Sequence, residues 1–290
     1  MQPATDVISY VPVDYIKARI KGVHKKWFFS NGLLNFIPVL DEGGEIRHYY
    51  AMYRGLKVKI YAQGTITLQG SLHKYWNYGQ HNYNDFSRSG FDEVIQSLRV
   101  TLGIEPSQLH ITCMEVGVNI VPPVKTASVL NNIFMHKGKD VEQRMSNDHA
   151  KFHCVEHDKF VIKLYDKAKQ YRLPIDLMRI ELKYTNWSSF RKIGIATLAD
   201  FIHCDKTIFK NDLLLRWDEL LFHDPTSQIP ERWTAYSNAN FWREKRDKVS
   251  RTAFSYQFKR LRTLNAKNGQ NLQAVIKQLV SDKLSTCMNT

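Results

Sequence analysis

Three segments near the middle of the chain, residues 110–121, 159–167 and 177–184, alternate between apolar and polar side chains. Because successive side chains of a β-strand point to opposite faces, this period of two predicts strands with one face on a core. If the three strands share one antiparallel sheet, their other face gathers an unusual mixture of ionisable groups. The polar positions are Glu115, Gly117, Asn119, Lys163, Tyr165, Lys167, Arg179, Glu181 and Lys183.

The rest of the chain predicts strands first and helices last. Residues 7–72 have the pattern of strands and turns, and a helix with Ser89 as its N-cap and Gly103 at its end follows. Residues 125–156 are polar and predict an irregular insertion with one short helix, whereas 241–264 and 272–284 predict two C-terminal helices. We therefore expect an α+β fold: a central antiparallel sheet with packed helices and a helical C-terminal appendage. The expected domains are residues 1–200 and 201–290.

The charge of the chain is strongly positive, with 41 Lys and Arg against 28 Asp and Glu, a net charge of +13. Such a chain favours a polyanionic partner; nucleic acid is the first candidate and an anionic membrane surface the second. No run approaches the roughly 20 apolar residues of a spanning helix. The first ten residues lack the pattern of a signal peptide, and the four cysteines are widely spaced. These features predict a reduced, cytoplasmic protein with no membrane partner.

Tyr165 is the residue whose surroundings suggest chemistry. A phenol has a pKa near 10 and is a poor nucleophile at neutral pH unless positive charge or a base activates it. Tyr165 stands between Lys163 and Lys167, and Glu115 and Glu181 are expected on the same face. Carboxylates of this kind can hold a hard cation such as Mg²⁺ or Mn²⁺, which polarises a phosphoryl group. The alternative is the solvated face of an ordinary antiparallel sheet.

The motifs around this tyrosine resemble those of replication initiators. The run Lys163-Leu-Tyr-Asp-Lys167, followed by Arg179-Ile-Glu-Leu182, is similar to motifs of filamentous-phage gene II-type proteins and of the transposase-like Rep group of rolling-circle plasmid initiators. Residues 69–75 and 80–86 resemble a neighbourhood of the phage group, and residues 112–119 fall where the family has a strand with an acidic residue. The resemblance spans residues 64–199, nearly half of the chain.

The resemblance implies an endonuclease that nicks phage or plasmid origin DNA, single-stranded or extruded, through a covalent phosphotyrosine. It religates the DNA, starts rolling-circle replication and works with the host replication machinery in the bacterial cytoplasm. Tyr165 would be the nucleophile, with Lys167 and Arg179 beside it. Glu115 and Asp166 would be ligands of Mg²⁺ or Mn²⁺, and Glu181 a further ligand or a support for Arg179.

Two features depart from that pattern. Many rolling-circle endonucleases carry a His-hydrophobic-His metal pair, and this chain has none. Asp166 directly follows Tyr165, so on a regular strand the two side chains face opposite sides, and a bulge or strand end would be needed to bring them to one metal.

Further residues are candidates for DNA contact. His73 and His81 lie in an aromatic-rich stretch that suits stacking on unpaired bases, although a packed loop is the alternative. The basic run after residue 242 suits contact with the DNA backbone, although a solvated helix face is the alternative. Two other classes of protein stay open: a non-catalytic DNA-binding regulator, and a structural or RNA-binding protein. The DNA-binding candidates are His73, Lys74, His81, Asn82, Lys163, Arg243, Lys245 and Arg246.

Overall fold

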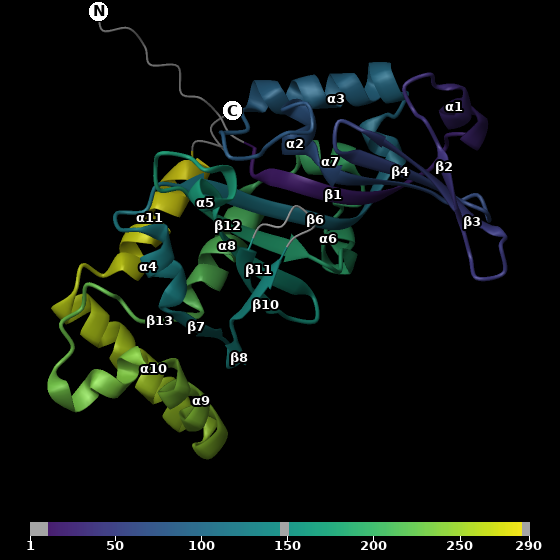
Figure 1. Cartoon of the computed structure of the whole chain (residues 1–290). Helices are drawn as coiled ribbons and strands as arrows, with labels where there is room; N and C mark the ends of the chain where they lie inside the picture. Colours follow the sequence, from purple (N-terminus) through teal and green to yellow (C-terminus); the bar gives the residue numbers. More distant parts are fainter. Residues whose placement is uncertain (1–10, 146–150, 286–290) are drawn as a thin grey trace, which may run out of the picture.

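The computed structural model describes residues 11–145 and 151–285, and within them a ten-stranded antiparallel sheet is the dominant element (Figure 1). Its strand order is β2-β3-β4-β5-β1-β6-β12-β11-β10-β9. The first ten residues, which the signal-peptide argument concerns, and Cys287 lie outside the described residues. The strands are β1 (Val13–Ile20), β2 (Ile37–Leu40), β3 (Ile46–Tyr53), β4 (Leu56–Tyr61), β5 (Ile66–Ser71), β6 (Leu109–Ile120), β9 (Glu142–Met145), β10 (Lys151–Glu156), β11 (Phe160–Asp166) and β12 (Met178–Tyr184).

The three alternating segments are strands, as predicted, and they are neighbours in one sheet. β12 lies between β6 and β11 and pairs antiparallel with both. In this register Arg179 stands opposite Tyr165 on one side and Asn119 on the other, while Glu181 stands opposite Lys163 and Gly117. One face of these strands is therefore apolar and the other carries the ionisable residues, which confirms the alternation.

Helices bury the apolar face of the sheet. The apolar side chains of α3 (Arg88–Leu102), α7 (Leu198–His203), α8 (Thr207–Asp218) and α11 (Leu272–Ser285) join the strands in one large core. Ser87, and not the predicted Ser89, caps α3, whereas Gly103 ends it in the left-handed conformation as expected. The short helices are α1 (Lys25–Ser30), α2 (Leu72–Trp76), α4 (Thr126–Asn131), α5 (Lys167–Tyr171) and α6 (Ser188–Lys192).

The prediction of an irregular insertion at residues 125–156 was wrong. After α4, the chain forms β7 (Ile133–His136) and β8 (Lys139–Asp140), which join β13 (Leu220–Phe222) in a separate three-stranded sheet. It then forms β9 and β10, which extend the main sheet beyond β11. The polar composition misled the prediction because β9 is an edge strand whose residues are all exposed.

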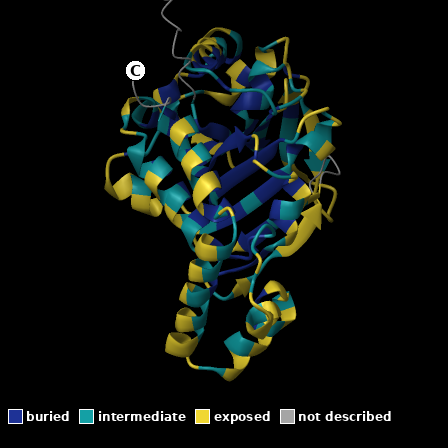
Figure 2. Cartoon of the chain, turned by 90° about the vertical axis from the view of Figure 1, so that its left-hand side faces the viewer, coloured by how far each residue is buried: buried dark blue, intermediate teal, exposed yellow. Residues whose placement is uncertain are grey.

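The C-terminal helices divide between two cores. α11 packs against α8 and β6 and belongs to the large core. α9 (Ala239–Lys248) and α10 (Arg251–Asn268) pack with β7 and β13 around Trp242 and Leu261 in a second, smaller core. Figures 1 and 2 show these two helices projecting from one end of the molecule, largely exposed. The fold is thus α+β with C-terminal helices, as expected, and the domain boundary near residue 200 stays a prediction. Among the described residues, no helix is both long and apolar enough to cross a membrane.

Gly117 allows β6 and β12 to approach closely beside the ionisable residues. A Cβ atom at this position would lie 2.4 Å from the carbonyl oxygen of Ile180 and 2.7 Å from Cγ of Glu181. The first of these atoms belongs to the backbone of a central strand, which cannot move without disturbing its neighbours. Glycine is therefore required here by packing and not by its backbone angles.

We expect Gly117→Ala to lower the free energy of unfolding by about 1–3 kcal/mol, because the added methyl group overpacks two central strands. Urea unfolding measures the change. Gly32→Ala is the matched control, since a Cβ at Gly32 meets nothing within 4 Å. Equal stability of the two variants would show that β12 shifts freely, contrary to the packing described above.

Candidate functional site

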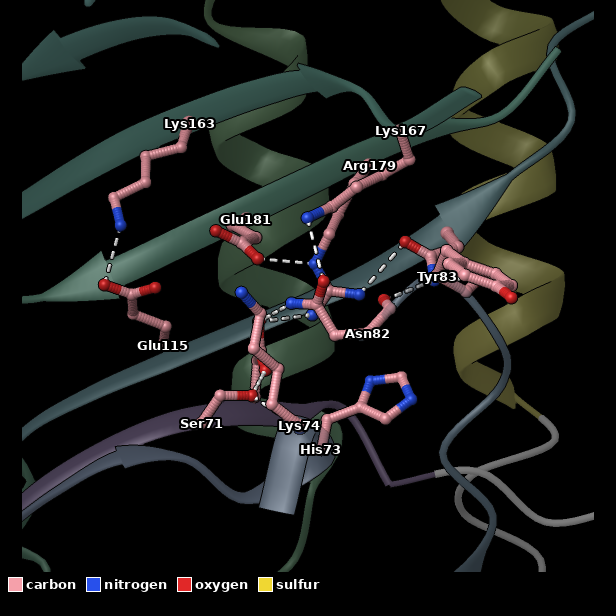
Figure 3. A network of polar contacts seen from close by, with 12 residues as sticks. Ser71, His73, Lys74, Asn82, Tyr83, Glu115, Lys163, Lys167, Arg179 and Glu181 are labelled. Atoms are coloured by element: carbon pink, nitrogen blue, oxygen red, sulfur yellow. Dashed lines mark hydrogen bonds and ion pairs between the residues drawn. The ribbon is translucent and has the colours of Figure 1, made fainter. Parts of the chain in front are cut away.

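Tyr165 lies on the polar face, near the end of β11 (Figure 3 shows the neighbouring side chains). Its side chain is only 8% exposed. The ring of Phe152, from the adjacent β10, stacks on it with centroids 5.1 Å apart. The ammonium group of Lys167, at the start of α5, lies 4.6 Å from the ring centroid. The tyrosine is thus held between an aromatic ring and a cation.

Arg179, directly across from Tyr165, is the most heavily engaged cation of the cluster. Its guanidinium donates to Glu181, to Oδ1 of Asn119 at 3.0 Å, and to Oδ2 of Asp14 on β1 at 3.1 Å. Arg179, Asp14 and Glu181 are each 3% exposed or less. One buried cation therefore pairs with two buried carboxylates and links β1, β6 and β12.

Asn82 joins this ion cluster to Lys167. Its amide donates to Oδ2 of Asp14 at 2.7 Å, while its Oδ1 accepts from Nζ of Lys167 at 3.0 Å and from the hydroxyl of Tyr171 at 3.1 Å. Asn119 fixes the loop that carries Asn82, because its amide lies 2.9–3.2 Å from the carbonyl oxygens of residues 82–84. The loop between α2 and α3 is therefore part of the site.

Glu115 forms a second ion cluster on the same face. Its Oε1 accepts from Nζ of Lys163 at 2.7 Å and lies 3.3 Å from Nζ of Lys183. Glu115 is buried and both lysines are partly exposed. Here two cations surround one carboxylate, so this cluster has an excess of positive charge.

The surroundings of Tyr165 keep it a neutral phenol. Burial raises its pKa far above the usual value, and the carboxylates of Glu181, Glu115 and Asp14 raise it further. Burial raises the pKa of Glu181 as well. Burial would also raise the pKa of Asp14, but Arg179, His73, Ser71 and Lys167 together outweigh it and hold that pKa well below the usual range. A nucleophilic Tyr165 would need a base and a change in this charge balance.

Lys167 is the titratable group best placed to act as this base. Burial lowers its pKa to about 8, because the protein interior disfavours the ammonium form. The amide oxygens of Asn82 and Gln170, at 3.0 and 2.9 Å, hold the amine in place. A lysine with this pKa exists partly as the free amine near neutral pH and can accept a proton.

The predicted metal ligands do not form a metal centre in this arrangement. Within residues 11–145 and 151–285, no three His, Cys, Asp or Glu side chains are grouped so that they could hold a metal ion. Glu115 is paired with lysines, and Glu181 with Arg179. Asp166 ends β11 and caps α5 by accepting from the backbone N–H of Lys169 at 2.8 Å. At Glu115 and Glu181, a divalent cation would have to displace the side-chain cations that already pair with these carboxylates.

The histidines predicted to contact DNA lie in the loop region beside the site. His73 is buried, stacks on Phe86 with centroids 4.8 Å apart and bonds to Asn84 at 2.8 Å. Burial lowers its pKa to about 4, so it is neutral at pH 7. His81 stacks on Tyr83 with centroids 4.0 Å apart. Lys74 lies on α2, next to His73 (Figure 3).

The basic residues of α9 lie away from this cluster. Arg243 and Arg246 both pair with Asp140 of β8, at 3.0 and 2.9 Å. The ammonium group of Lys245 lies 5.4 Å from the ring centroid of Phe241. Figure 1 shows α9 at the projecting end of the molecule and α5, which follows Tyr165, near the opposite end. The structure thus brings together the sheet and loop candidates but not those of α9.

Two residues of the site escaped sequence reasoning. Asp14 looks like an isolated acid at the start of an apolar strand, and its partner Arg179 lies 165 residues away. The available signal was an acidic residue among apolar neighbours, because a carboxylate that becomes buried with them needs a cation. Phe152 was hidden in the segment predicted to be irregular.

Comparisons with known proteins give little further information. No protein-family model matches the chain, and no curated protein matches it. Among solved structures, the rolling circle replication initiator protein from Geobacillus stearothermophilus is similar over 89% of this chain and 98% of its own, with 14% identity and a TM-score of 0.40. A likeness at this level assigns no role to any residue here.

The buried amine of Lys167 predicts a pH dependence of stability. Its pKa is about 8 when folded and 10.5 when unfolded, so between these values the unfolded chain binds more protons and stability rises with pH. We expect the free energy of unfolding of the wild type minus that of Lys167→Met to be constant below pH 8 and to rise above it. Urea unfolding between pH 7 and 10 measures this difference. The exposed Lys169→Met is the control, and a difference that does not change with pH would refute the assignment.

The paired carboxylates predict weak metal binding by the free protein. We expect calorimetric titration with MnCl₂ to give no saturable heat, since Lys163 and Lys183 already neutralise Glu115. Glu115→Gln should behave in the same way. Saturable binding to the wild type that Glu115→Gln removes would show that the carboxylate is available to a metal.

Proposed function

We propose that this protein is a DNA strand transferase that acts through Tyr165. The observation that carries the proposal is the position of this tyrosine: it lies on the polar sheet face, opposite Arg179, with Lys167 over its ring and Lys163 on the same strand. Arg179 and Lys163 supply the cations that phosphodiester cleavage needs beside the nucleophile, because negative charge develops on the phosphate oxygens. The resemblance of the surrounding motifs to replication initiators favours the same activity.

The reaction exchanges one phosphoester bond for another. The Tyr165 oxygen attacks a phosphorus atom of the DNA backbone, the bond from phosphorus to the 3′-oxygen breaks, and a 5′-phosphotyrosine forms. The phenolic proton passes to a base, for which Lys167 is the candidate, and the released 3′-oxygen takes up a proton. Attack by a 3′-hydroxyl on the phosphotyrosine reverses these steps and rejoins the strand.

The biological setting that we propose is the start of rolling-circle replication at a phage or plasmid origin, in the bacterial cytoplasm and with the host replication machinery. The freed 3′-hydroxyl would prime synthesis. In this proposal the basic residues of α9 (Arg243, Lys245 and Arg246) would contact the DNA backbone, after release of Asp140 where they are paired. Mg²⁺ or Mn²⁺ remains a hypothesis for the loaded site alone, because Glu115 and Glu181 are already paired with side-chain cations in the free protein.

One observation favours a second candidate, a non-catalytic DNA-binding regulator. The cavity next to Arg179 and His73 has a volume of about 20 Å³, which is room for about one water molecule. Tyr165 is itself buried and its pKa is raised far above the usual value. A regulator would use the same basic surfaces without ever exposing this tyrosine.

Formation of a covalent adduct separates the two candidates. Wild-type protein incubated with labelled single-stranded DNA of random sequence, with and without MnCl₂, should give a band of slower mobility in denaturing electrophoresis. Tyr165→Phe removes only the hydroxyl group and should abolish this band while retaining DNA affinity within about twofold, because no phosphate-binding cation is lost.

Tyr171→Phe is the matched control. This tyrosine lies in the same cluster and its hydroxyl donates to Asn82 at 3.1 Å, so its loss perturbs the site without removing the proposed nucleophile. The adduct should persist in this variant. An adduct that survives Tyr165→Phe and disappears in Tyr171→Phe would transfer the role to Tyr171, and the absence of any adduct from wild type would favour the regulator.

A further inference from the structure

The polar face of the sheet continues well beyond Tyr165, toward the N-terminal strands. Lys17 of β1 and Lys57 of β4 both stand opposite Gln69 of β5. Arg19 of β1 and Lys59 of β4 both stand opposite Thr67. Because directly paired residues point to the same face, these four cations lie on one face as two pairs that flank β5. We call Lys17, Arg19, Lys57 and Lys59 the lysine strip.

The same face of the sheet connects the strip to the candidate site. Tyr15, two residues before Lys17 on the same face, stands opposite Glu115 of β6, and Glu115 stands opposite Lys183 of β12. The ammonium group of Lys183 lies 5.6 Å from the ring centroid of Tyr15. From β11 to β4 there are five strand spacings, which span about 24 Å. One face therefore carries cations from the N-terminal strands to Tyr165.

The charges of the strip are not compensated. Within the part of the chain that the structure describes, none of its four cations forms an ion pair with a carboxylate. Burial lowers the pKa of Lys59, and repulsion from Lys57, Lys17 and Arg47 lowers it further. The pKa of His48, opposite Tyr61 on the same face, falls for similar reasons. Crowded like charges destabilise the free protein and favour an anionic partner that spans several of them.

Aromatic rings accompany these cations. Tyr50 of β3 stands opposite Lys59, and the ammonium group of Lys57 lies 5.1 Å from its ring centroid. His48 and Tyr61 lie next to each other, with ring centroids 5.4 Å apart. Tyr50, His48 and Tyr61 are only partly buried. Partly exposed rings between cations suit unpaired bases and the phosphates that link them, because every base has a face that can stack.

We propose that the lysine strip binds the single-stranded DNA that extends from the nicking site, with phosphates on its cations and bases on Tyr50 and Tyr61. This inference rests on the proposed function for the end of the strand that reaches Tyr165. The stacking surfaces favour unpaired bases over duplex DNA, whose bases are covered. Lys183 and Lys163 continue the path to the tyrosine, and Glu115 is the carboxylate between them.

The test compares oligonucleotide affinities in a background that cannot cleave. Tyr165→Phe protein, with or without Lys57→Gln and Lys59→Gln, is titrated with fluorescent oligothymidylates of about 4 to about 16 nucleotides at several salt concentrations. We expect the double substitution to weaken binding of the longest oligonucleotide roughly tenfold at 0.15 M salt. It should reduce the slope of log affinity against log salt by about 1.4, which corresponds to two phosphate contacts. The shortest oligonucleotide should lose much less.

Lys25→Gln with Lys26→Gln is the matched control. Both lysines are exposed on α1, so their substitution removes the same charge from a surface outside the strip. The control's affinity and salt slope should stay close to those of the parent. The strip variant should keep or raise the melting temperature, since it relieves repulsion. Lys17→Gln, a single change at an exposed residue, repeats the test with a smaller expected slope change of about 0.7.

The outcomes separate this inference from the proposed function. An unchanged affinity and slope in both strip variants would overturn the inference, even if wild type forms the Tyr165 adduct. If the strip variants lose affinity for DNA but the wild type forms no adduct, DNA binding by the strip is supported and the nicking reaction is refuted. A duplex of the same length is the further comparison. If it binds as tightly as the single strand and loses as much affinity in the strip variant, the strip is a general polyanion surface and the assignment to single strands is overturned.

Discussion

The buried guanidinium of Arg179 is the interaction on which the polar face of this protein depends. It forms ion pairs with Asp14 and Glu181, both buried, and donates to Asn119. Removing it would leave two carboxylates without a cation, and breaking a buried ion pair from one side costs about 3–5 kcal/mol. Through Asp14 the same network reaches Asn82, and through Asn82 it reaches Lys167. The position of the candidate base is therefore tied to the ion cluster at the centre of the sheet.

This charge balance also defines what the free protein can do. Two of the carboxylates that resemble metal ligands, Glu115 and Glu181, are paired with lysine or arginine, and Tyr165 is a neutral phenol stacked on Phe152. A DNA phosphate brings negative charge that competes with Glu115 for Lys163 and Lys183. Its arrival would release Glu115 and place cations next to the nucleophile. In our proposal, the substrate thus completes the site, and the resting arrangement is stable because its charges are already paired.

The sequence was most informative where periodicity decides the structure. Strict alternation predicted the faces of β6, β11 and β12, and with them the grouping of Tyr165, Arg179, Glu181 and Glu115. It failed where local pattern and tertiary context disagree. The polar edge strand β9 and its neighbour β10 resemble a loop in the sequence. Ser87 and Ser89 are equally good cap residues, so the sequence does not show which of them begins the helix. Asp166 takes a local cap at the end of its strand, a competing use of a carboxylate that spacing does not reveal.

The two parts of the polar face differ in a way that suggests a division of labour. Around Tyr165 the carboxylates of Asp14, Glu115 and Glu181 are buried, paired with cations and held in fixed geometry. On the lysine strip the cations are more exposed, repel one another and lack partners among the described carboxylates. Fixed, paired charges suit a site where one bond must be aligned, because preorganised groups need not rearrange during reaction. Unpaired, exposed charges suit a surface that holds a flexible polyanion, because each phosphate bound there releases counterions. A strand held on the strip would be tethered close to Tyr165, and this proximity would raise the effective concentration of its next phosphate at the nucleophile.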